Sequence, residues 1–407
     1  MPRNRRVWAV PRDRRDVDNV RAVIQTAVDA GVVPGAVALV RHRGEAVLHE
    51  AFGSANALAP TRPMAPDTVF DLASLTKPLV GASVTLALVD RGCFSLDEEV
   101  TTWLPELEPF RAKGVTLRRL LAHTAGVTGW RPIYTGAAGS QGVVQAIGAL
   151  GLAAVPGSRF EYSDLGYILL GVALERASGA GLAELAGELV FEPCGLTRTG
   201  YLPAGPADDF AVTEEGNAFE RRMADWAGLD FARWRTSFHP GEVNDGNAHY
   251  GLGGVSAHAG LFSTAADVGT LGEMWLRRGS HDGRQVISEA SIELAVSDQM
   301  PPGNAPRGLG WELFRRGGPT LEEIRRADAG FFPPVASPFT PRSSGELLSA
   351  SAFGHTGFTG TSIWIDPELE IVAVLLTNAT HPRVDLDKPL GAVRARFANA
   401  VAATVTS

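Results

Sequence analysis

A long apolar stretch from Leu79 to Val89 restricts the fold of this chain more than any other feature. A run of this length and composition is typical of a buried helix, and Gly92 just beyond it is a common helix stop. Pro78 directly precedes the run, and proline is tolerated only in the first turn of a helix. The sequence therefore predicts a buried helix that begins near Ser74.

Ser74 and Lys77 lie three residues apart, so on a helix the lysine amine lies one turn behind the serine hydroxyl and can reach it. The chain contains only two other lysines, Lys113 and Lys388, and otherwise uses arginine. Arginine does not release its proton in a protein, whereas a partly buried lysine can act as a base. The pair is a candidate nucleophile and base, although three lysines give this spacing by chance on the order of one time in five.

The composition indicates a soluble globular enzyme that does not bind nucleic acid. The 407 residues, 45% apolar and 20% charged, suffice for two to three domains of about 150 residues each. The net charge of -8 argues against nucleic acid as a partner and against a basic membrane-binding face. No apolar run approaches the ~18 residues that a transmembrane helix needs.

Residues 1–15 contain six arginines around a short apolar segment. A secretory signal needs a longer apolar region, so we expect a disordered or loosely attached arm. Cys93 and Cys194 are too few for a disulfide framework and lack the spacing of a metal site. These features predict a cytoplasmic protein with two reduced cysteines and no metal.

Both ends of the chain have the patterns of helix and antiparallel strands, whereas the middle is mostly helices and loops. We therefore expect an α+β fold in which both ends form one domain, with an antiparallel sheet flanked by helices from both termini. The expected elements are helices at 17–30 and 390–405, and strand pairs at 35–41 with 45–51 and at 360–366 with 370–377.

The ranges of the predicted domains follow from these elements. The α/β domain is expected at 16–72 and 301–407, and an inserted, mostly helical domain at 73–300, with the active site at the junction. Residues 302–342 are rich in proline and glycine and are the best candidate for a long loop or lid. The role of the wider stretch 302–350 cannot be read from the sequence.

Two further segments contain residues suited to chemistry. Tyr162 lies at the mouth of a predicted helix, where a nearby cation would lower the pKa of its phenol. The alternative is a structural tyrosine before a helix cap at Ser163 or Asp164. His355-Thr356-Gly357 precedes a predicted strand, and the glycine lets backbone N–H groups approach a substrate carbonyl. A lone histidine is more often structural, so this motif alone leaves both interpretations open.

In order and spacing, the three motifs resemble the active-site motifs of serine β-lactamases and penicillin-binding enzymes. The resemblance is to the class C-like branch, which includes esterases and D-alanyl-D-alanine peptidases, and it implies a β-lactamase/transpeptidase-like fold. Segments 115–127 and 260–267 also resemble this family. The three motifs are Ser74-x-x-Lys77, Tyr162-x-Asp164 and His355-Thr356-Gly357.

The resemblance implies a role for each matching residue. Ser74 is then the acylated nucleophile, Lys77 and Tyr162 are the proton-relay pair, and water hydrolyses the acyl-enzyme. The backbone N–H groups of Ser74 and Phe358 form the oxyanion hole, and no metal or organic cofactor is implied. The residues implied to bind the substrate are Asp164, His355, Thr356 and Gly357.

Two residues depart from the pattern of class C β-lactamases. Asp164 stands where those enzymes have asparagine, so a carboxylate replaces an amide donor; it either accepts hydrogen bonds or pairs with Lys77 and holds it charged. His355 replaces the usual lysine and removes a permanent cation. Both changes favour an esterase or amidase that acts on a less anionic substrate.

The sequence thus predicts a serine hydrolase that cleaves a small-molecule ester, amide or lactam through an acyl-enzyme on Ser74, with carboxylesterase activity favoured. The alternatives are a D-alanyl-D-alanine carboxypeptidase or weak β-lactamase and, from another class, a non-catalytic ligand-binding protein of the same fold. A binding protein does not need Ser74, Lys77 and Tyr162 together, which disfavours the last. The chain lacks a Gly-x-Ser-x-Gly elbow and a His-Glu-x-x-His zinc motif.

Three more polar residues allow two interpretations. Asp245 and His258 lie in a glycine-rich segment, 241–260, where they either line the cleft or, as we favour, hold the loop through hydrogen bonds. His123 is expected to fix a turn rather than to take part in chemistry. Acyl and leaving-group specificity and the oligomeric state cannot be read from the sequence.

Overall fold

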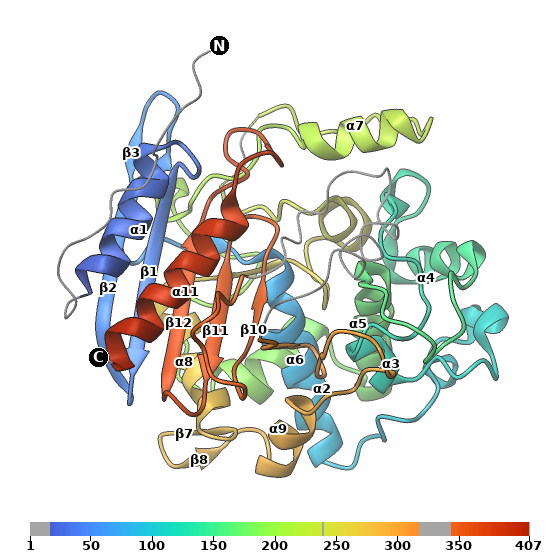
Figure 1. Cartoon of the computed structure of the whole chain (residues 1–407). Coiled ribbons are helices and arrows are strands. Elements are labelled where there is room, and N and C mark those ends of the chain that lie inside the picture. Colours follow the sequence, from blue (N-terminus) through green and yellow to red (C-terminus); the bar gives the residue numbers. More distant parts are fainter. Residues whose placement is uncertain (1–16, 238–239, 317–342, 407) are drawn as a thin grey trace.

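The computed structural model describes residues 17–237, 240–316 and 343–406, and Figure 1 shows how its elements are arranged. The expected arm at 1–15 lies outside the described residues, as does the part of the expected 302–342 loop from residue 317 on. No helix within the described ranges has both the length and the apolarity of a membrane span.

A seven-stranded sheet joins the two ends of the chain. Its strand order is β3-β2-β1-β12-β11-β10-β9, and the central pair, β1 with β12, runs antiparallel from Ala36–Thr377 to His42–Ile371. The expected strand pairs are confirmed as β1 with β2 and β11 with β12. The strands are β1 (Gly35–His42), β2 (Glu45–Asn56), β3 (Arg62–Pro63), β9 (Glu312–Leu313), β10 (Phe353–Thr356), β11 (Ser362–Asp366) and β12 (Ile371–Thr377).

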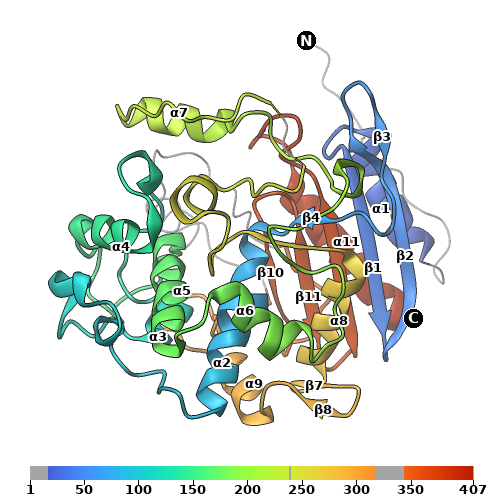
Figure 2. The same cartoon turned by 180° about the vertical axis from the view of Figure 1, so that it is seen from behind.

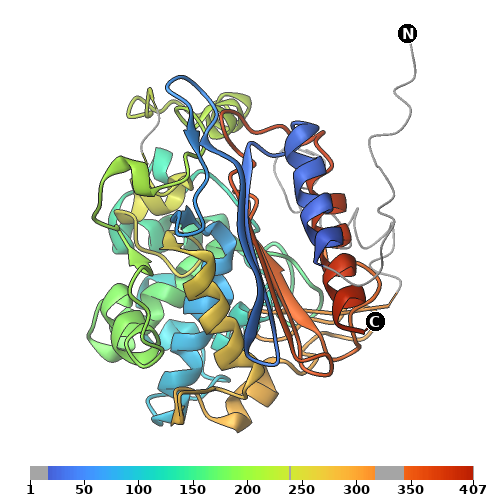
Figure 3. The same cartoon turned by 90° about the vertical axis from the view of Figure 1, so that its left-hand side faces the viewer.

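Helices from both termini cover one face of this sheet. Figure 3 shows α1 (Asp18–Asp29) and α11 (Leu390–Thr406) side by side on that face. Val20, Ile24 and Ala27 of α1 recur at the spacing of one helix face and are buried in the core between these helices and the sheet. α8 (Ala265–Leu276) packs on the opposite face. This combination of helices and antiparallel sheet is the α+β fold that the sequence predicts.

Most of the other helices lie on the α8 side of the sheet, as Figures 2 and 3 show. They are α2 (Ser83–Asp90), α3 (Leu117–Leu121), α4 (Gly139–Leu150), α5 (Asp164–Ser178), α6 (Leu182–Ala186), α7 (Ala218–Trp226) and α9 (Glu289–Ala295). Two small sheets accompany them, namely β4 (Phe70–Asp71), β5 (Gly200–Tyr201) and β6 (Leu261–Ser263), and β7 (Ser280–His281) with β8 (Arg284–Gln285). Since α8 falls within 73–300 and packs on the large sheet, the domain ranges stay a prediction.

The predicted helix after Ser74 is present and buried, but it is built from three kinds of turn. A 3-10 turn at Ala73–Leu75 leads into a π-helical turn at Lys77–Ala82, and α2 continues from there. Gly92 ends the helix with a φ of +69°, and its N–H donates to the carbonyl of Val89. π-helical turns are rare and are frequent at functional sites, which directs attention to the first turn.

Candidate active site

Ser74 lies in a turn that hydrogen bonds tie to the sheet. Ala73 before it has a left-handed φ of +47°, and the Asp71 carboxylate accepts the Ala73 N–H at 2.8 Å. The hydroxyls of Thr359 and Thr361, in the turn after β10, donate to backbone carbonyls of the Ser74 segment at 2.8 and 2.9 Å. A left-handed non-glycine residue costs on the order of 1 kcal/mol or more, so these bonds hold a strained backbone at the serine.

Lys77 is fully buried, and its ammonium group makes two hydrogen bonds and one ion pair with neighbouring oxygen atoms. Its Nζ lies 2.9 Å from Ser74 Oγ, 3.1 Å from the carbonyl oxygen of His258 and 2.6 Å from Oδ1 of Asp164. Burial lowers the pKa of this amine, but Asp164 and then Tyr162 raise it by more, so the pKa lies above its ordinary value. Lys77 is therefore charged in the resting site, and Asp164 takes the second of its two expected roles.

Asp164 can reach Lys77 because its neighbour caps the helix. Ser163 Oγ accepts the N–H of Gly166 at 2.8 Å, which makes Ser163 the N-cap of α5. The Asp164 carboxylate thus stands in the first turn of α5, where the helix dipole favours a negative charge.

Tyr162 completes the group around Lys77. Its ring centroid lies 5.0 Å from Lys77 Nζ, and its phenol interacts with Ser74 and Lys77. Burial raises the pKa of the phenol, and Lys77 offsets only part of this rise, so the resting Tyr162 is protonated. The structure thus brings together the nucleophile and both relay residues that the sequence singled out, although their roles stay a proposal.

His123 supports Tyr162, which no sequence pattern indicated. The two rings stack with centroids 4.4 Å apart and 29° between their planes. His123 Nδ1 accepts the N–H of Ser163 at 3.0 Å, which fixes the segment that carries the phenol. Burial holds the pKa of the imidazole well below 6.5, so the ring is neutral. Its φ of +57° agrees with the expected turn.

His355 lies on β10, with its ring centroid 6.2 Å from that of Tyr162. Because the Thr356 carbonyl can only accept, His355 Nδ1 donates to it, at 2.8 Å. Burial, followed by the charges of Arg307 and Lys77, holds the pKa of His355 well below 6.5. His355 is neutral, so it does not supply the permanent charge of the lysine found at this place in β-lactamases.

The backbone after β10 passes close to the Ser74 turn. A Cβ at Gly357 would lie 2.1 Å from Thr361 Oγ1 and 2.5 Å from the carbonyl oxygen of Leu72, so only glycine fits. The ring of Phe358, the next residue, packs on Phe219 of α7 with centroids 5.5 Å apart. An oxyanion hole made by the N–H groups of Ser74 and Phe358 stays a prediction.

Asp245 and His258 hold their loop through hydrogen bonds and connect it to Lys77. His258 Nε2 lies 2.8 Å from Asp245 Oδ1, and His258 Nδ1 lies 2.7 Å from Ser256 Oγ. His258 lowers the pKa of Asp245 against the opposing effect of burial, so this carboxylate is ionised and accepts from Nε2. These bonds fix the imidazole of His258. The backbone carbonyl of the same residue accepts a hydrogen bond from Lys77.

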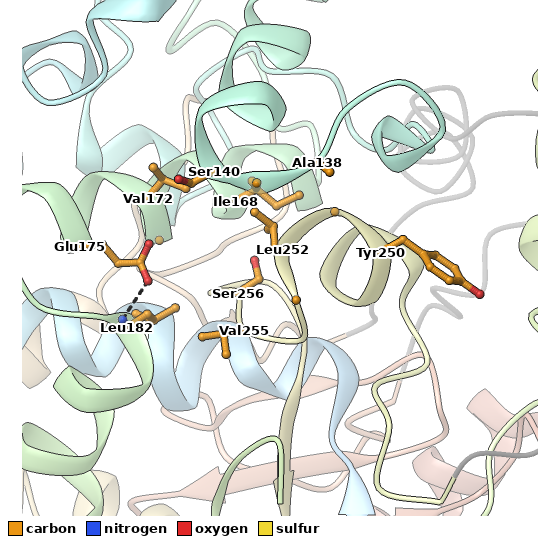
Figure 4. Close-up of a pocket in the computed structure, with 14 residues that line it drawn as sticks. Ala138, Ser140, Ile168, Val172, Glu175, Leu182, Tyr250, Leu252, Val255 and Ser256 are labelled. Atoms are coloured by element: carbon orange, nitrogen blue, oxygen red, sulfur yellow. Dashed lines mark hydrogen bonds between the residues drawn. The ribbon is translucent and has the colours of Figure 1, made fainter. Parts of the chain in front are cut away.

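A cavity of about 460 Å³ lies behind this loop, and Ser256 lines it (Figure 4). Its apolar wall includes Ile168 and Val172 of α5, with Leu252 and Val255 from the loop. Neither Ser74 nor Lys77 lines the cavity, which is therefore separate from the candidate site. Within the described ranges, no group of three or more histidine, cysteine, aspartate and glutamate side chains has a metal-binding arrangement.

Glu220 is a buried carboxyl whose titration should affect stability. Burial and the neighbouring Asp245 raise its pKa to about 8 from 4.5. A folded-state pKa above the unfolded value means that its contribution to stability is lost as pH rises from 4.5 through 8. Glu220→Gln, which cannot ionise, should therefore lose less stability than the wild type between pH 5 and pH 8, by on the order of 3 kcal/mol.

Denaturant unfolding at the two pH values measures this difference. Glu184→Gln, at an exposed position, is the control and should match the wild type at both. Equal pH dependence in Glu220→Gln and the wild type would contradict the assignment.

Comparisons with known proteins agree with this geometry. A family model described as Beta-lactamase matches residues 20–396. Esterase EstB of Burkholderia gladioli is 32% identical, over 88% of this chain and 90% of its own. A provisionally named D-alanyl-D-alanine carboxypeptidase of Escherichia coli O157:H7 is 30% identical, over 89% of this chain and 82% of its own. A class C β-lactamase from Rhodobacter sphaeroides has a TM-score of 0.69 at 20% identity, covering 96% of this chain and 100% of its own.

The fold is thus that of the β-lactamase/transpeptidase-like proteins. The chain belongs to the β-lactamase family and is a serine hydrolase. The predicted resemblance, fold class and enzyme class are confirmed.

Proposed function

We propose that this serine hydrolase cleaves a small-molecule carboxylic ester, or less readily an amide, through an acyl-enzyme on Ser74. The observation that carries the proposal is the buried contact of 2.9 Å between Lys77 Nζ and Ser74 Oγ. The neutral His355 supports an ester over an anionic β-lactam, because no cation stands on β10 to bind a carboxylate. The similarity to an esterase of 32% identity points the same way.

The charge state of Lys77 constrains the proposed proton route. An ammonium ion cannot accept the Ser74 proton unless it releases one of its own, and Asp164 Oδ1 lies 2.6 Å from Nζ. As Lys77 takes the proton from Ser74 Oγ, it passes another to Asp164, and Oγ attacks the ester carbonyl carbon. The proposed oxyanion donors are the N–H groups of Ser74 and Phe358.

Tyr162 is the proposed acid, because its phenol is protonated at rest. It donates its proton to the leaving alkoxide as the C–O bond breaks, which leaves a phenolate. The proton held by Lys77 and Asp164 then returns to Tyr162, and water hydrolyses the acyl-enzyme through the same groups in reverse.

A fluorophosphonate probe tests the nucleophile. We expect a covalent adduct on the peptide containing Ser74, found by mass spectrometry, together with turnover of p-nitrophenyl acetate. Ser74→Ala should lose both, whereas Ser140→Ala, at an exposed serine, should keep both. A folded wild-type protein without an adduct on Ser74 would rule out the proposal.

A D-alanyl-D-alanine carboxypeptidase or weak β-lactamase is the second candidate, favoured by the relative of 30% identity. Rates on p-nitrophenyl acetate, a D-alanyl-D-alanine peptide and a chromogenic cephalosporin separate the two. Faster turnover of the peptide or the cephalosporin than of the ester would favour the second candidate over an esterase. A cytoplasmic location, which the unpaired Cys93 and Cys194 support, fits an ester better than a peptidoglycan substrate, and cell fractionation tests it.

A further inference from the structure

Arg307 is a buried cation that forms no ion pair with a carboxylate of the described residues. The residue is 9% exposed, and its Nη1 has no hydrogen-bond partner within the described part of the chain. Its backbone is fixed, since its N–H donates to Asp298 Oδ1 at 3.2 Å and its carbonyl accepts from Gln299 at 2.8 Å. Glu312 forms no ion pair with it; burial raises the pKa of that carboxyl, and the charges of Arg307 and Arg394 oppose this rise. A guanidinium stays charged under all ordinary conditions, so Arg307 places a buried positive charge here that forms no ion pair with any described residue.

This charge lies against Tyr162. The Arg307 guanidinium carbon is 5.7 Å from the centroid of the Tyr162 ring and 5.1 Å from that of Phe160. These distances are within the range of cation–π contacts, which strengthen when the groups are shielded from water. An attraction to a neutral ring grows further when the ring carries the negative charge of a phenolate.

The other described groups around Tyr162 do not supply a net positive charge. Lys77 lies 5.0 Å from the ring, but Asp164 offsets its charge at 2.6 Å. His123 and His355 also surround the ring, and both are neutral. Ser74 and Tyr167 are uncharged at neutral pH. Among these described neighbours of Tyr162, Arg307 is therefore the cation that no ion pair offsets.

We propose that Arg307 is a positioning residue that stabilises the phenolate formed when Tyr162 gives its proton to the leaving group. The inference rests on the proposed function, because it requires Tyr162 as the acid. In that step the O–H bond of Tyr162 breaks, its electron pair stays on the phenolate oxygen, and the proton joins the departing alkoxide oxygen. Arg307 makes this step easier without touching the substrate.

The nature of the leaving group provides a selective test. An ethyl ester leaves as an alkoxide and needs the proton of Tyr162, whereas p-nitrophenolate leaves without one. In Arg307→Gln we therefore expect kcat/KM for ethyl butyrate to fall by about 10- to 100-fold, and kcat/KM for p-nitrophenyl butyrate by only a few-fold. Arg307→Lys keeps the charge and should restore most of the ethyl ester rate.

Arg159→Gln is the matched control. Arg159 is a nearby arginine whose side chain is 57% exposed and pairs with Glu161. Its loss removes a charge without removing a contact to Tyr162, so both esters should react as in the wild type.

Several outcomes would overturn the inference. An equal fall for both esters in Arg307→Gln indicates a purely structural role, and no fall indicates no role. A rise in KM confined to esters that carry a carboxylate makes Arg307 a substrate anchor instead. If Arg307→Gln does not fold, Arg307→Lys still tests the proposal. In that variant the ratio of kcat/KM for ethyl butyrate to kcat/KM for p-nitrophenyl butyrate must stay within about threefold of the wild-type ratio.

Labelling separates this inference from the proposed function. If the fluorophosphonate modifies Ser74 in the wild type and in the Arg307 variants but leaving-group selectivity is unchanged, only the role of Arg307 fails. If Ser74 of the wild type is not modified, the proposed function fails.

Discussion

Lys77→Arg should lower kcat for p-nitrophenyl acetate by about three to four orders of magnitude, although the positive charge is kept. An arginine still offers donors to Ser74 and Asp164, but its guanidinium does not release a proton and so cannot pass one from Oγ to the carboxylate. Charge alone would suffice if Lys77 only stabilised an oxyanion. The variant therefore separates proton transfer from electrostatic attraction.

Lys113→Arg is the control for this substitution. Lys113 is exposed, and the same change there should leave kcat unaltered. Because Lys77 is fully buried and arginine is larger, circular dichroism and a thermal melt must show that the variant is folded. A folded Lys77→Arg enzyme that keeps more than about a tenth of the wild-type kcat would contradict the base role.

Asp164→Asn should lower the free energy of unfolding at pH 7 by about 3–5 kcal/mol, because removing one partner of a buried ion pair leaves the other charge uncompensated. The pair is Lys77 with Asp164, 2.6 Å apart, with side chains 0% and 13% exposed. Equilibrium denaturation measures the loss. Asp97→Asn breaks an ion pair with Arg118 in which the carboxylate is 64% exposed, and should cost no more than about 1 kcal/mol.

The sign of the pH dependence gives this prediction a second readout. Asp164 raises the pKa of Lys77 above 10.5, so the stability it contributes is present below pH 10.5 and is lost as pH rises through the folded-state pKa. The difference between the wild type and Asp164→Asn should therefore be large at pH 7 and shrink above pH 10.5. A difference that stays constant across this range would show that the ion pair is not its cause.

Local patterns predicted the parts of the site that depend on sequence neighbours. The apolar run predicted the helix after Ser74, and the i, i+3 spacing predicted the contact between Ser74 and Lys77, since both follow from helix geometry. The 3-10 and π-helical turns at its start had no local signal, and the backbone that enters them is held by long-range hydrogen bonds from Thr359 and Thr361 to the carbonyls of Asp71 and Leu72.

Long-range partners were the part that the sequence left open. The His258 carbonyl accepts from Lys77 across 181 positions, and a backbone carbonyl has no residue type to signal it. Asp164 had two expected roles, and only the geometry selects the pair with Lys77. Arg307 lies in a stretch where proline and glycine predict only loop, so its contact with Tyr162 had no periodic signal.

The hydrogen bonds from Thr359 and Thr361 to the backbone just before Ser74 have a consequence for the order in which the protein folds. The bond between Thr359 and Asp71 spans 288 positions, and the central ladder pairs β1 with β12. A ribosome releases the helix of Ser74 long before the strands that hold its first turn, and contacts of such separation form late because a long loop must close first. A nascent chain thus carries Ser74, the proposed nucleophile, in an unfinished turn. We therefore expect Ser74 to take its final geometry, and hydrolysis to begin, only when the C-terminal strands of the sheet have docked.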